Sequence, residues 1–394
     1  MSFLFKLFAI LGIVFAYFAY SPHLLDFHPK PFTVRQWSEL TGPLTVNNRL
    51  NEGERLFDGA IDAPESLAVY QGEIYTGTRD GCITKISGKN FNCLVNLNKL
   101  CEKQKAIPCS RPLGLRFDAK GTLYVADAQL GLLQVDIKKG TVTTLVSTGE
   151  KVEEKEIMIP DDLDMDENGV IYFSDVSTKW KFDTIFYSVA EHENTGRIIQ
   201  YDPKTKKASV LLDGLYFPNG VQFSKKKDSL LIAEIVKERV LKYYLKGAKK
   251  GQLEVLVEFP GMVDNLRPSK NGYWVAINNF KNSSKPGIMD HLSKYPLVKK
   301  AAVRYLHSIN KVVNYATDYW PALKTKQLER FLSIESYFDK NHGMIVEFDE
   351  DGKIINSLHS PDGKSSLFSE VLEYNGYLYV GSYVNPVIIK VKQT

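Results

Sequence analysis

One short sequence phrase occurs six times along this 394-residue chain, and each copy is followed by the same kind of strand. An apolar or small residue, usually followed by proline, precedes one variable residue and the start of an apolar strand. The copies read APESLAV, RPLGLRF, IPDDLDM, FPNGVQF, MVDNLRP and LFSEVLE. The variable position is occupied by Glu65, Leu113, Asp161, Asn219, Asp264 and Ser369. Repetition of this length is typical of a repeat fold in which each unit is one supersecondary element.

The spacing of the copies indicates which repeat fold is present. Successive copies are 48, 48, 58, 45 and 105 residues apart, close to the roughly 40–50 residues of a four-stranded propeller blade except in the last interval. Between the copies, β-branched and aromatic runs alternate with turn residues, as in short antiparallel strands. The sequence therefore predicts an all-β, six-bladed β-propeller over residues 51–394. A pair of β-sandwich domains is the alternative, but it has no reason to repeat one position six times.

The long last interval predicts an insertion in the fifth blade. Within residues 281–340 the strand pattern stops, and apolar side chains recur at helical intervals on one face. This face comprises Leu297, Val298, Ala301, Ala302, Tyr305 and Leu306. The sixth unit ends almost at the C-terminus, so we expect a strand near residues 55–57 to complete the last sheet and close the ring.

The N-terminus is a different kind of sequence. Residues 7–25 contain His23 as their only side chain that ionises near neutral pH, and their length of nineteen residues approaches the roughly 20 needed to cross a bilayer. We predict an uncleaved signal anchor within residues 1–27 and a stalk over residues 28–50. Lys6 marks the cytosolic side, so the propeller would be lumenal or extracellular, in a type II protein of the endoplasmic reticulum or plasma membrane. A cleaved signal peptide is the alternative, but Pro22 would follow the cut after Ser21.

The four cysteines support the same compartment. Cys82 and Cys93 flank a predicted hairpin turn, and Cys101 and Cys109 bracket a short polar loop. Two local disulfides suit an oxidising environment, and the spacing does not match a zinc site. The sequon at Asn282 adds a candidate N-glycosylation site.

Charge and motifs exclude several function classes. The formal net charge is only +4, and the lysine clusters at 204–207 and 225–227 fall in predicted hairpin turns. Nucleic-acid binding is therefore not expected. The chain contains no GxSxG, HExxH or GxGxxG motif, which leaves serine-hydrolase, zinc-protease and dinucleotide-binding functions without support.

The repeated variable position predicts a metal site. Equivalent positions of a radial repeat lie at equal distance from one axis, so these side chains should converge. Glu65, Asp161, Asn219 and Asp264 would supply oxygen ligands of the kind that Ca²⁺ prefers, and Asn265 could add another if its strand starts irregularly. Such an ion would either polarise a substrate carbonyl, with Asp264 or Asp161 as general base, or only join the blades. Buried acids satisfied by backbone amides are a further alternative.

The strings RPLGLRF, VADAQLGLL, YFSDVSTKW, LLDGLYFPNGVQFS, VDNLRPSKNGYWV and EYNGYLYVGS carry a family resemblance. Over roughly residues 44–391 the chain resembles the strictosidine synthase-like propellers, in the branch of adipocyte plasma membrane-associated proteins. The wider superfamily includes paraoxonases and gluconolactonases. The resemblance implies a membrane-anchored, calcium-dependent hydrolase with arylesterase-like activity on small-molecule esters or lactones. It also implies that Glu65, Asp161, Asn219, Asp264 and Asn265 match the axial calcium ligands of those hydrolases.

Three departures from the resemblance qualify this hypothesis. Asp161 stands where those relatives usually carry asparagine, and Leu113 stands where paraoxonases carry a histidine of their proposed base pair. Ser369 matches the catalytic glutamate of the plant synthases, while the adjacent Glu370 would point to the other side of its strand. Carbon–nitrogen bond formation is therefore not expected. A non-catalytic binding propeller with structural calcium remains the alternative, and three histidines could replace the missing base: His291, His307 and His359.

Overall fold

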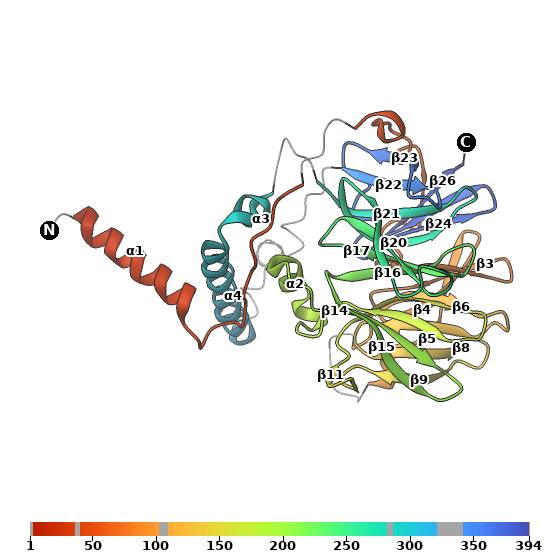
Figure 1. Cartoon of the computed structure of the whole chain (residues 1–394), viewed down its shortest axis with the longest axis horizontal. Coiled ribbons are helices and arrows are strands. Elements are labelled where there is room, and N and C mark those ends of the chain that lie inside the picture. Colours follow the sequence, from red (N-terminus) through yellow and green to blue (C-terminus); the bar gives the residue numbers. More distant parts are fainter. Residues whose placement is uncertain (1–2, 36–39, 102–108, 282–286, 321–341, 394) are drawn as a thin grey trace. The chain divides into compact units, whose positions relative to one another are not determined.

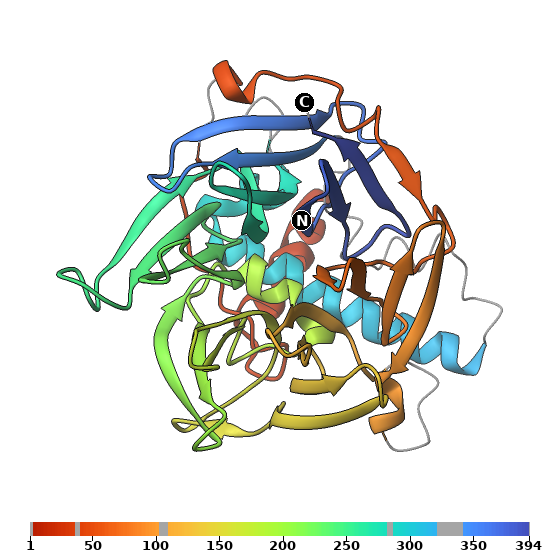
Figure 2. The same ribbon diagram turned by 90° about the vertical axis from the view of Figure 1, so that its right-hand side faces the viewer.

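The computed structural model describes residues 3–35, 40–101, 109–281, 287–320 and 342–393. The chain divides into two compact units, one of residues 1–37, 186–193 and 282–339 and the other of the remainder. The described part of the larger unit forms six four-stranded antiparallel sheets and a two-stranded ribbon. Figure 1 labels their strands, and Figure 2 shows the sheets arranged radially around a common centre. The predicted six-bladed β-propeller is confirmed.

Each of the first three blades consists of four strands that follow one another in the chain. The first blade contains β2 (Leu67–Tyr70), β3 (Glu73–Gly77), β4 (Cys82–Ser87) and β5 (Asn90–Asn96). The second contains β6 (Pro112–Phe117), β7 (Leu123–Asp127), β8 (Gly131–Asp136) and β9 (Thr141–Ser147). The third contains β12 (Pro160–Met165), β13 (Ile171–Asp175), β14 (Gly196–Asp202) and β15 (Lys207–Leu215).

The fourth and fifth blades follow the same order, whereas the sixth combines both ends of the chain. The fourth contains β16 (Pro218–Phe223), β17 (Ser229–Glu234), β18 (Arg239–Tyr244) and β19 (Leu253–Glu258). The fifth contains β20 (Gly261–Pro268), β21 (Tyr273–Phe280), β22 (Gly343–Phe348) and β23 (Ile354–Ser360). The sixth contains β24 (Glu370–Tyr374), β25 (Tyr377–Gly381), β26 (Ile388–Lys392) and β1 (Glu54–Leu56).

Short elements lie between the strands. The ribbon strands β10 (Lys151–Val152) and β11 (Lys155–Glu156) connect the second and third blades, and the 3₁₀ turn η2 (Leu97–Leu100) connects the first and second. The turn η1 (Gly42–Leu44) precedes β1, and η3 (Phe182–Thr184) follows β13 within the third blade.

The ring closes as the sequence predicts. The N-terminal strand β1 pairs antiparallel with the C-terminal strand β26, with Arg55 opposite Ile389. The first strands of the blades contact one another in the order β2, β6, β12, β16, β20, β24 and back to β2. Because the first and last residues of the propeller share one sheet, every blade has two neighbours and the ring leaves no gap.

Apolar side chains hold neighbouring blades together. Separate buried clusters lie between each adjacent pair of sheets, such as Tyr172 and Val221 between the third and fourth blades. Trp274 and Val371 pack in the same way between the fifth and sixth blades. The alternation of inward and outward side chains along each strand produces these clusters, since both faces of a blade meet a neighbour.

The smaller unit is helical. Its elements are α1 (Phe3–Tyr20), α2 (Phe186–Glu191), α3 (Ile288–His291), η4 (Leu292–Lys294) and α4 (Pro296–Tyr319). The last three fall between β21 and β22 in the chain, so the fifth blade carries a helical insertion, as predicted. Arg304 of α4 donates hydrogen bonds to the carbonyl oxygens of Phe18, Ala19 and Ser21 and thereby satisfies acceptors at the C-terminal end of α1.

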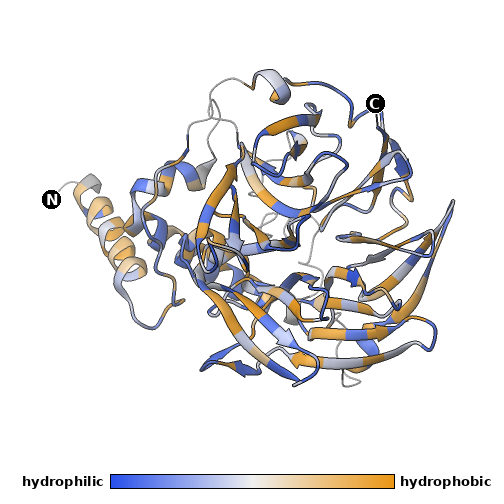
Figure 3. Cartoon of the chain, turned by 45° about the vertical axis from the view of Figure 1, so that its right-hand side comes forward, coloured by the Kyte–Doolittle hydropathy of each residue, from blue (hydrophilic) through white to orange (hydrophobic). Residues whose placement is uncertain are grey.

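The helix α1 does not have the bounds expected from the apolar stretch at residues 7–25. It begins at Phe3, four residues earlier, and ends at Tyr20. Pro22 explains the early end, because proline disfavours helical backbone at the residue before it. Figure 3 shows that the helix is mostly hydrophobic, and large apolar side chains such as Phe8 and Ile13 are exposed. Among the described residues, no helix meets the length and apolarity needed to cross a membrane.

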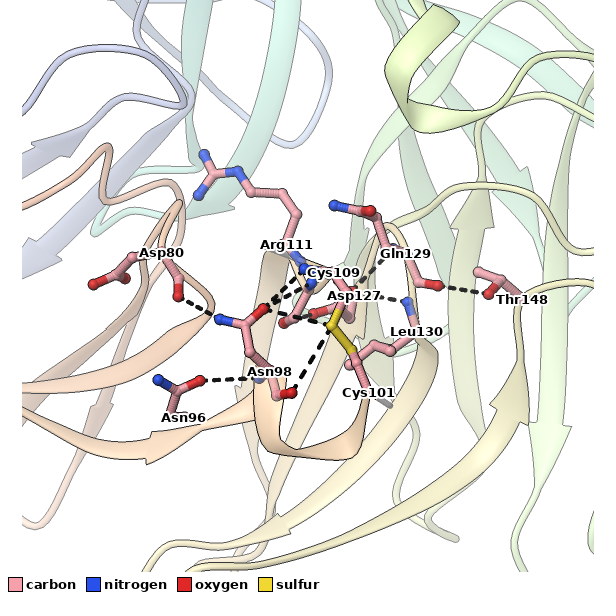
Figure 4. Close-up of a disulfide and its surroundings, with 11 residues drawn as sticks. Asp80, Asn96, Asn98, Cys101, Cys109, Arg111, Asp127, Gln129, Leu130 and Thr148 are labelled. Carbon is pink, nitrogen blue, oxygen red and sulfur yellow. Dashed lines mark hydrogen bonds between the residues drawn. A yellow bond between two sulfur atoms is a disulfide. The ribbon is translucent and has the colours of Figure 1, made fainter. Parts of the chain in front are cut away.

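Both predicted disulfides are present. Cys82 bonds Cys93 within the first blade, and Cys101 bonds Cys109 in the connection to the second blade. Figure 4 shows Asn98 beside the second disulfide: its side-chain oxygen accepts the backbone N–H of Cys109 at 2.9 Å. The chain is therefore anchored just before it enters the second blade. The candidate glycosylation site Asn282 lies outside the described residues.

A buried histidine predicts a pH dependence of stability. His359 of β23 lies between the Ser357 hydroxyl, at 2.7 Å, and the His342 ring, at 2.8 Å. Burial, aided by His342, lowers the pKa of His359 to about 4, whereas an unfolded histidine titrates near about 6.5. As the pH falls between these values, the unfolded chain binds a proton that the folded chain does not, so stability decreases.

We expect this effect to cost about 3 kcal/mol of unfolding free energy by pH ~4. His359→Gln should remove that part of the pH dependence in urea titrations, while the same change at the exposed His291 should not. Equal slopes for wild type and His359→Gln would contradict the assignment.

Candidate metal centre

The first strand of several blades begins with a β-bulge at the repeated variable position. In β12 the register with β13 shifts after Pro160, so that Asp161 and Asp162 together face Ser174. A bulge of this kind turns side chains away from the regular alternation of a strand. The same register shift occurs in two further blades. In β16 it places Asn219 and Gly220 together opposite one residue of β17, and in β20 it places Asp264 and Asn265 together opposite one residue of β21.

Glycine at these positions permits close contact between blades. A β-carbon on Gly220 would lie 2.8 Å from the carbonyl oxygen of Asp264, and one on Gly114 would lie 2.7 Å from that of Asp161. Both distances are too short for a side chain. The backbones of neighbouring inner strands therefore approach directly, which brings the bulged residues of different blades toward one centre.

Five side chains of four blades form what we call the oxygen cluster: Glu65, Asp161, Asn219, Asp264 and Asn265. Each is at most 4% exposed. Asn265 donates a hydrogen bond of 2.8 Å to Glu65 Oε1, which joins the fifth blade to the first. Asn278 donates one of 2.7 Å to Asp264 Oδ2. Asn219 occupies the equivalent bulge of the fourth blade. These are the five ligands predicted from the sequence.

Each member of the oxygen cluster retains one buried oxygen atom without a hydrogen-bond partner. These atoms are Glu65 Oε2, Asp161 Oδ1, Asn219 Oδ1, Asp264 Oδ1 and Asn265 Oδ1. Buried polar atoms are nearly always paired, so these five unpartnered oxygen atoms, four of them at the repeated variable position, indicate a shared partner. A set composed of oxygen atoms alone fits a hard cation such as Ca²⁺. Among the described residues, no group of three or more His, Cys, Asp or Glu side chains is placed to hold a metal ion, so Glu65, Asp161 and Asp264 do not meet that criterion by themselves.

The pKa shifts of the oxygen cluster also bear on cation binding. Burial raises the pKa of Glu65, Asp161 and Asp264 well above the usual range, and each carboxyl is raised further by another of the three. The guanidinium of Arg111 opposes this rise at Glu65 and Asp161. Burial in turn lowers the pKa of Arg111 to about 10. The protein by itself therefore does not stabilise three ionised carboxylates at this site, and a bound cation would favour their ionised form.

A second group of charges lies next to the oxygen cluster, and sequence reasoning missed it. Arg267 binds both oxygens of Asp162, at 2.8 and 3.0 Å, and its Nε lies 2.5 Å from Glu370 Oε1. We call these three residues the central ion network. Asp162 and Glu370 directly follow two of the repeated variable positions, and this adjacency was the available signal.

The remaining predicted residues have other partners. Leu113 is buried and offers no polar atom. Ser369 donates its hydroxyl to the Glu65 carbonyl oxygen at 2.8 Å, so this hydroxyl holds two blades together. His359 is bound to Ser357 and His342, and His307 of the helical unit is bound to Tyr187. His291 lies in α3.

These features define a class: six-bladed propellers with a buried, oxygen-lined centre. Sequence comparison then gives the family. The strictosidine synthase family matches residues 161–248, and the strictosidine synthase-like N-terminal region matches residues 42–86. The adipocyte plasma membrane-associated protein of Danio rerio is 33% identical over 368 residues, which cover 92% of this chain and 83% of that protein. The chain belongs to the adipocyte plasma membrane-associated protein family of strictosidine synthase-like propellers.

Solved structures share the fold at low sequence identity. A gluconolactonase from Xanthomonas campestris superposes with a TM-score of 0.55 at 13% identity and covers 95% of this chain and 99% of its own. Regucalcin from Agrobacterium tumefaciens, described as a calcium-binding protein, gives a TM-score of 0.51 at 12% identity, covering 87% and 95%.

Proposed function

We propose that this protein is a membrane-anchored, calcium-dependent hydrolase of small esters or lactones, arylesterase-like in activity. The observation that carries the proposal is the set of five buried, unpartnered oxygen atoms supplied by the first, third, fourth and fifth blades. Support for the reaction class comes from the shared fold of a gluconolactonase and of a calcium-binding propeller.

The oxygen cluster would hold the ion. Three carboxylates and two amide oxygens approach the roughly six to eight oxygen ligands that Ca²⁺ takes, and water or substrate would complete the set. A bound calcium ion would act as a Lewis acid toward a substrate carbonyl oxygen. The amide of Asn265 orients Glu65, and the amide of Asn278 orients Asp264, so the free oxygens are fixed before any ligand enters.

We assign the role of general base to either Asp161 or Asp264. Hydrolysis adds water across the acyl carbon–oxygen bond, so a carboxylate must accept a proton from the attacking water. The leaving oxygen must receive one in return. The Oδ1 atoms of both residues are counted among the cation ligands, and Asp264 Oδ2 accepts a hydrogen bond from Asn278, so the second oxygen of Asp161 is the one left to accept the proton. Leu113 has no group that could share this task.

A non-catalytic binding propeller with a structural cation is the second candidate. It is favoured by the apolar Leu113 and by the low exposure of the oxygen cluster. In that function the ion would only join the blades. Cation binding alone is common to both functions, so turnover of an ester or lactone separates them.

Calcium removal should destabilise the protein. A ligand that binds only the folded state adds stability by mass action, about 2.7 kcal/mol at a hundredfold excess over Kd. We therefore expect EDTA to lower the thermal midpoint and added Ca²⁺ to restore it. Metal analysis together with melting curves measures this. An unchanged midpoint in EDTA for a metal-free protein would refute the cation site.

Substitutions in the oxygen cluster should abolish hydrolysis. Asp264→Ala and Asn219→Ala each remove a cluster oxygen, and we expect activity on a panel of aryl esters and lactones to fall by about 100-fold or more. Leu113→Ala is the control, since it should weaken packing only. Full activity in either cluster variant with calcium still bound would place the chemistry elsewhere.

The N-terminal segment would anchor the chain with the propeller lumenal or extracellular. The support is the exposed apolar surface of α1, the two disulfides and relatives named as plasma membrane-associated. We expect the chain to stay in membranes after carbonate washing and to carry a glycan on Asn282 that glycosidase removes. A soluble form starting near residue 20 would refute the anchor, and an unglycosylated chain with reduced cysteines would indicate the cytosol.

A further inference from the structure

The central ion network connects blades that are not neighbours. Arg267 belongs to β20 of the fifth blade and Asp162 to β12 of the third, with the fourth blade between them. Their contact is bidentate, at 2.8 and 3.0 Å, and both side chains are at most 5% exposed. Paired hydrogen bonds of this kind fix orientation as well as distance.

The other blades supply the remaining partners of the two residues. Asp162 Oδ2 accepts the backbone N–H of Val221, from the fourth blade, at 2.8 Å. The Arg116 guanidinium, from the second blade, lies 3.6 Å from Asp162 Oδ1. Glu370 of the sixth blade contacts Arg267 at 2.5 Å. The hydroxyl of Ser66, in the first blade, lies 3.4 Å from Arg267 Nη2. All six blades therefore meet at this one pair.

These partners are close in sequence to the oxygen cluster. Asp162 directly follows Asp161, Ser66 directly follows Glu65, and Arg267 lies two residues after Asn265. In the third blade a single bulge presents both Asp161 and Asp162, so a shift of Asp162 would move the backbone of Asp161 with it.

We propose that Arg267 is a positioning residue for the oxygen cluster. Its guanidinium acts as a permanent cation between Asp162 and Glu370, and it sets the distance between blades at which the cluster oxygens meet a divalent ion. This inference rests on the proposed cation site. Lysine could not replace it fully, because a single ammonium cannot bind Asp162 in a bidentate manner and also contact Glu370.

Calcium titration of the full chain purified in detergent tests the proposal, with Ca²⁺ alone as the probe. We expect Arg267→Met to weaken the Kd for Ca²⁺ by about 10- to 100-fold, as changes behind metal ligands do. Arg267→Lys should fall between this variant and the wild type. Glu370→Gln, which keeps the size of the side chain, should shift the Kd in the same direction and serves if Arg267→Met does not fold.

Arg197 provides the matched control. It forms an equally buried ion pair with Asp175, at 2.6 Å, but both residues belong to the third blade. Arg197→Lys should lower the thermal midpoint in EDTA and leave the Kd for Ca²⁺ unchanged, which separates lost stability from lost positioning.

The outcomes distinguish failure of the proposed cation site from failure of the positioning role of Arg267. A wild-type chain that binds no Ca²⁺ refutes the proposed function and this inference together. A wild type that binds, with Arg267→Lys and Glu370→Gln binding equally well, overturns only the positioning role.

Discussion

The bidentate contact between Asp162 and Arg267 is the interaction on which the centre of this propeller depends. The strands of each blade are hydrogen-bonded to one another, whereas neighbouring blades pack largely through apolar side chains, and apolar contact has no preferred direction. The ion pair adds a directional contact across the ring. Burying two charges is costly unless every hydrogen-bonding position is used, and here the N–H of Val221 and the carboxylate of Glu370 supply part of that compensation.

The same short segments build the fold and the candidate site. In the third blade, Asp161 belongs to the oxygen cluster and Asp162 to the central ion network, and a single bulge presents both. A regular strand would send consecutive side chains to opposite faces. The irregular start of β12 therefore allows one blade to contribute a residue to the oxygen cluster and another to the central ion network. The close contact of Gly114 with the backbone of Asp161 and Asp162 supports this arrangement. Binding at the cluster and cohesion of the blades are coupled through the backbone.

Much of this could be predicted from the sequence. The repeated phrase located the blades and the five residues of the oxygen cluster, and the missing last strand predicted closure by residues 55–57. The central ion network could not be predicted, because simple alternation placed Glu370 on the other side of its strand and gave no reason to pair Arg267 with a residue 105 positions earlier. The end of α1 was also missed, because hydropathy ignores the backbone restriction that Pro22 imposes.

Charge gives a physical reason for a divalent ion rather than a monovalent one. The oxygen cluster contains three carboxylates, Glu65, Asp161 and Asp264, and the nearby guanidinium of Arg111 offsets one of them. In the central ion network the negative charges of Asp162 and Glu370 are balanced by the positive charges of Arg267 and Arg116. If all three were ionised, two negative charges would remain without a counter-charge in a buried site, where unpaired charge is most costly; this is why burial raises the pKa of all three carboxyls. One divalent cation would neutralise those two charges, and the five free oxygens would serve as its ligands.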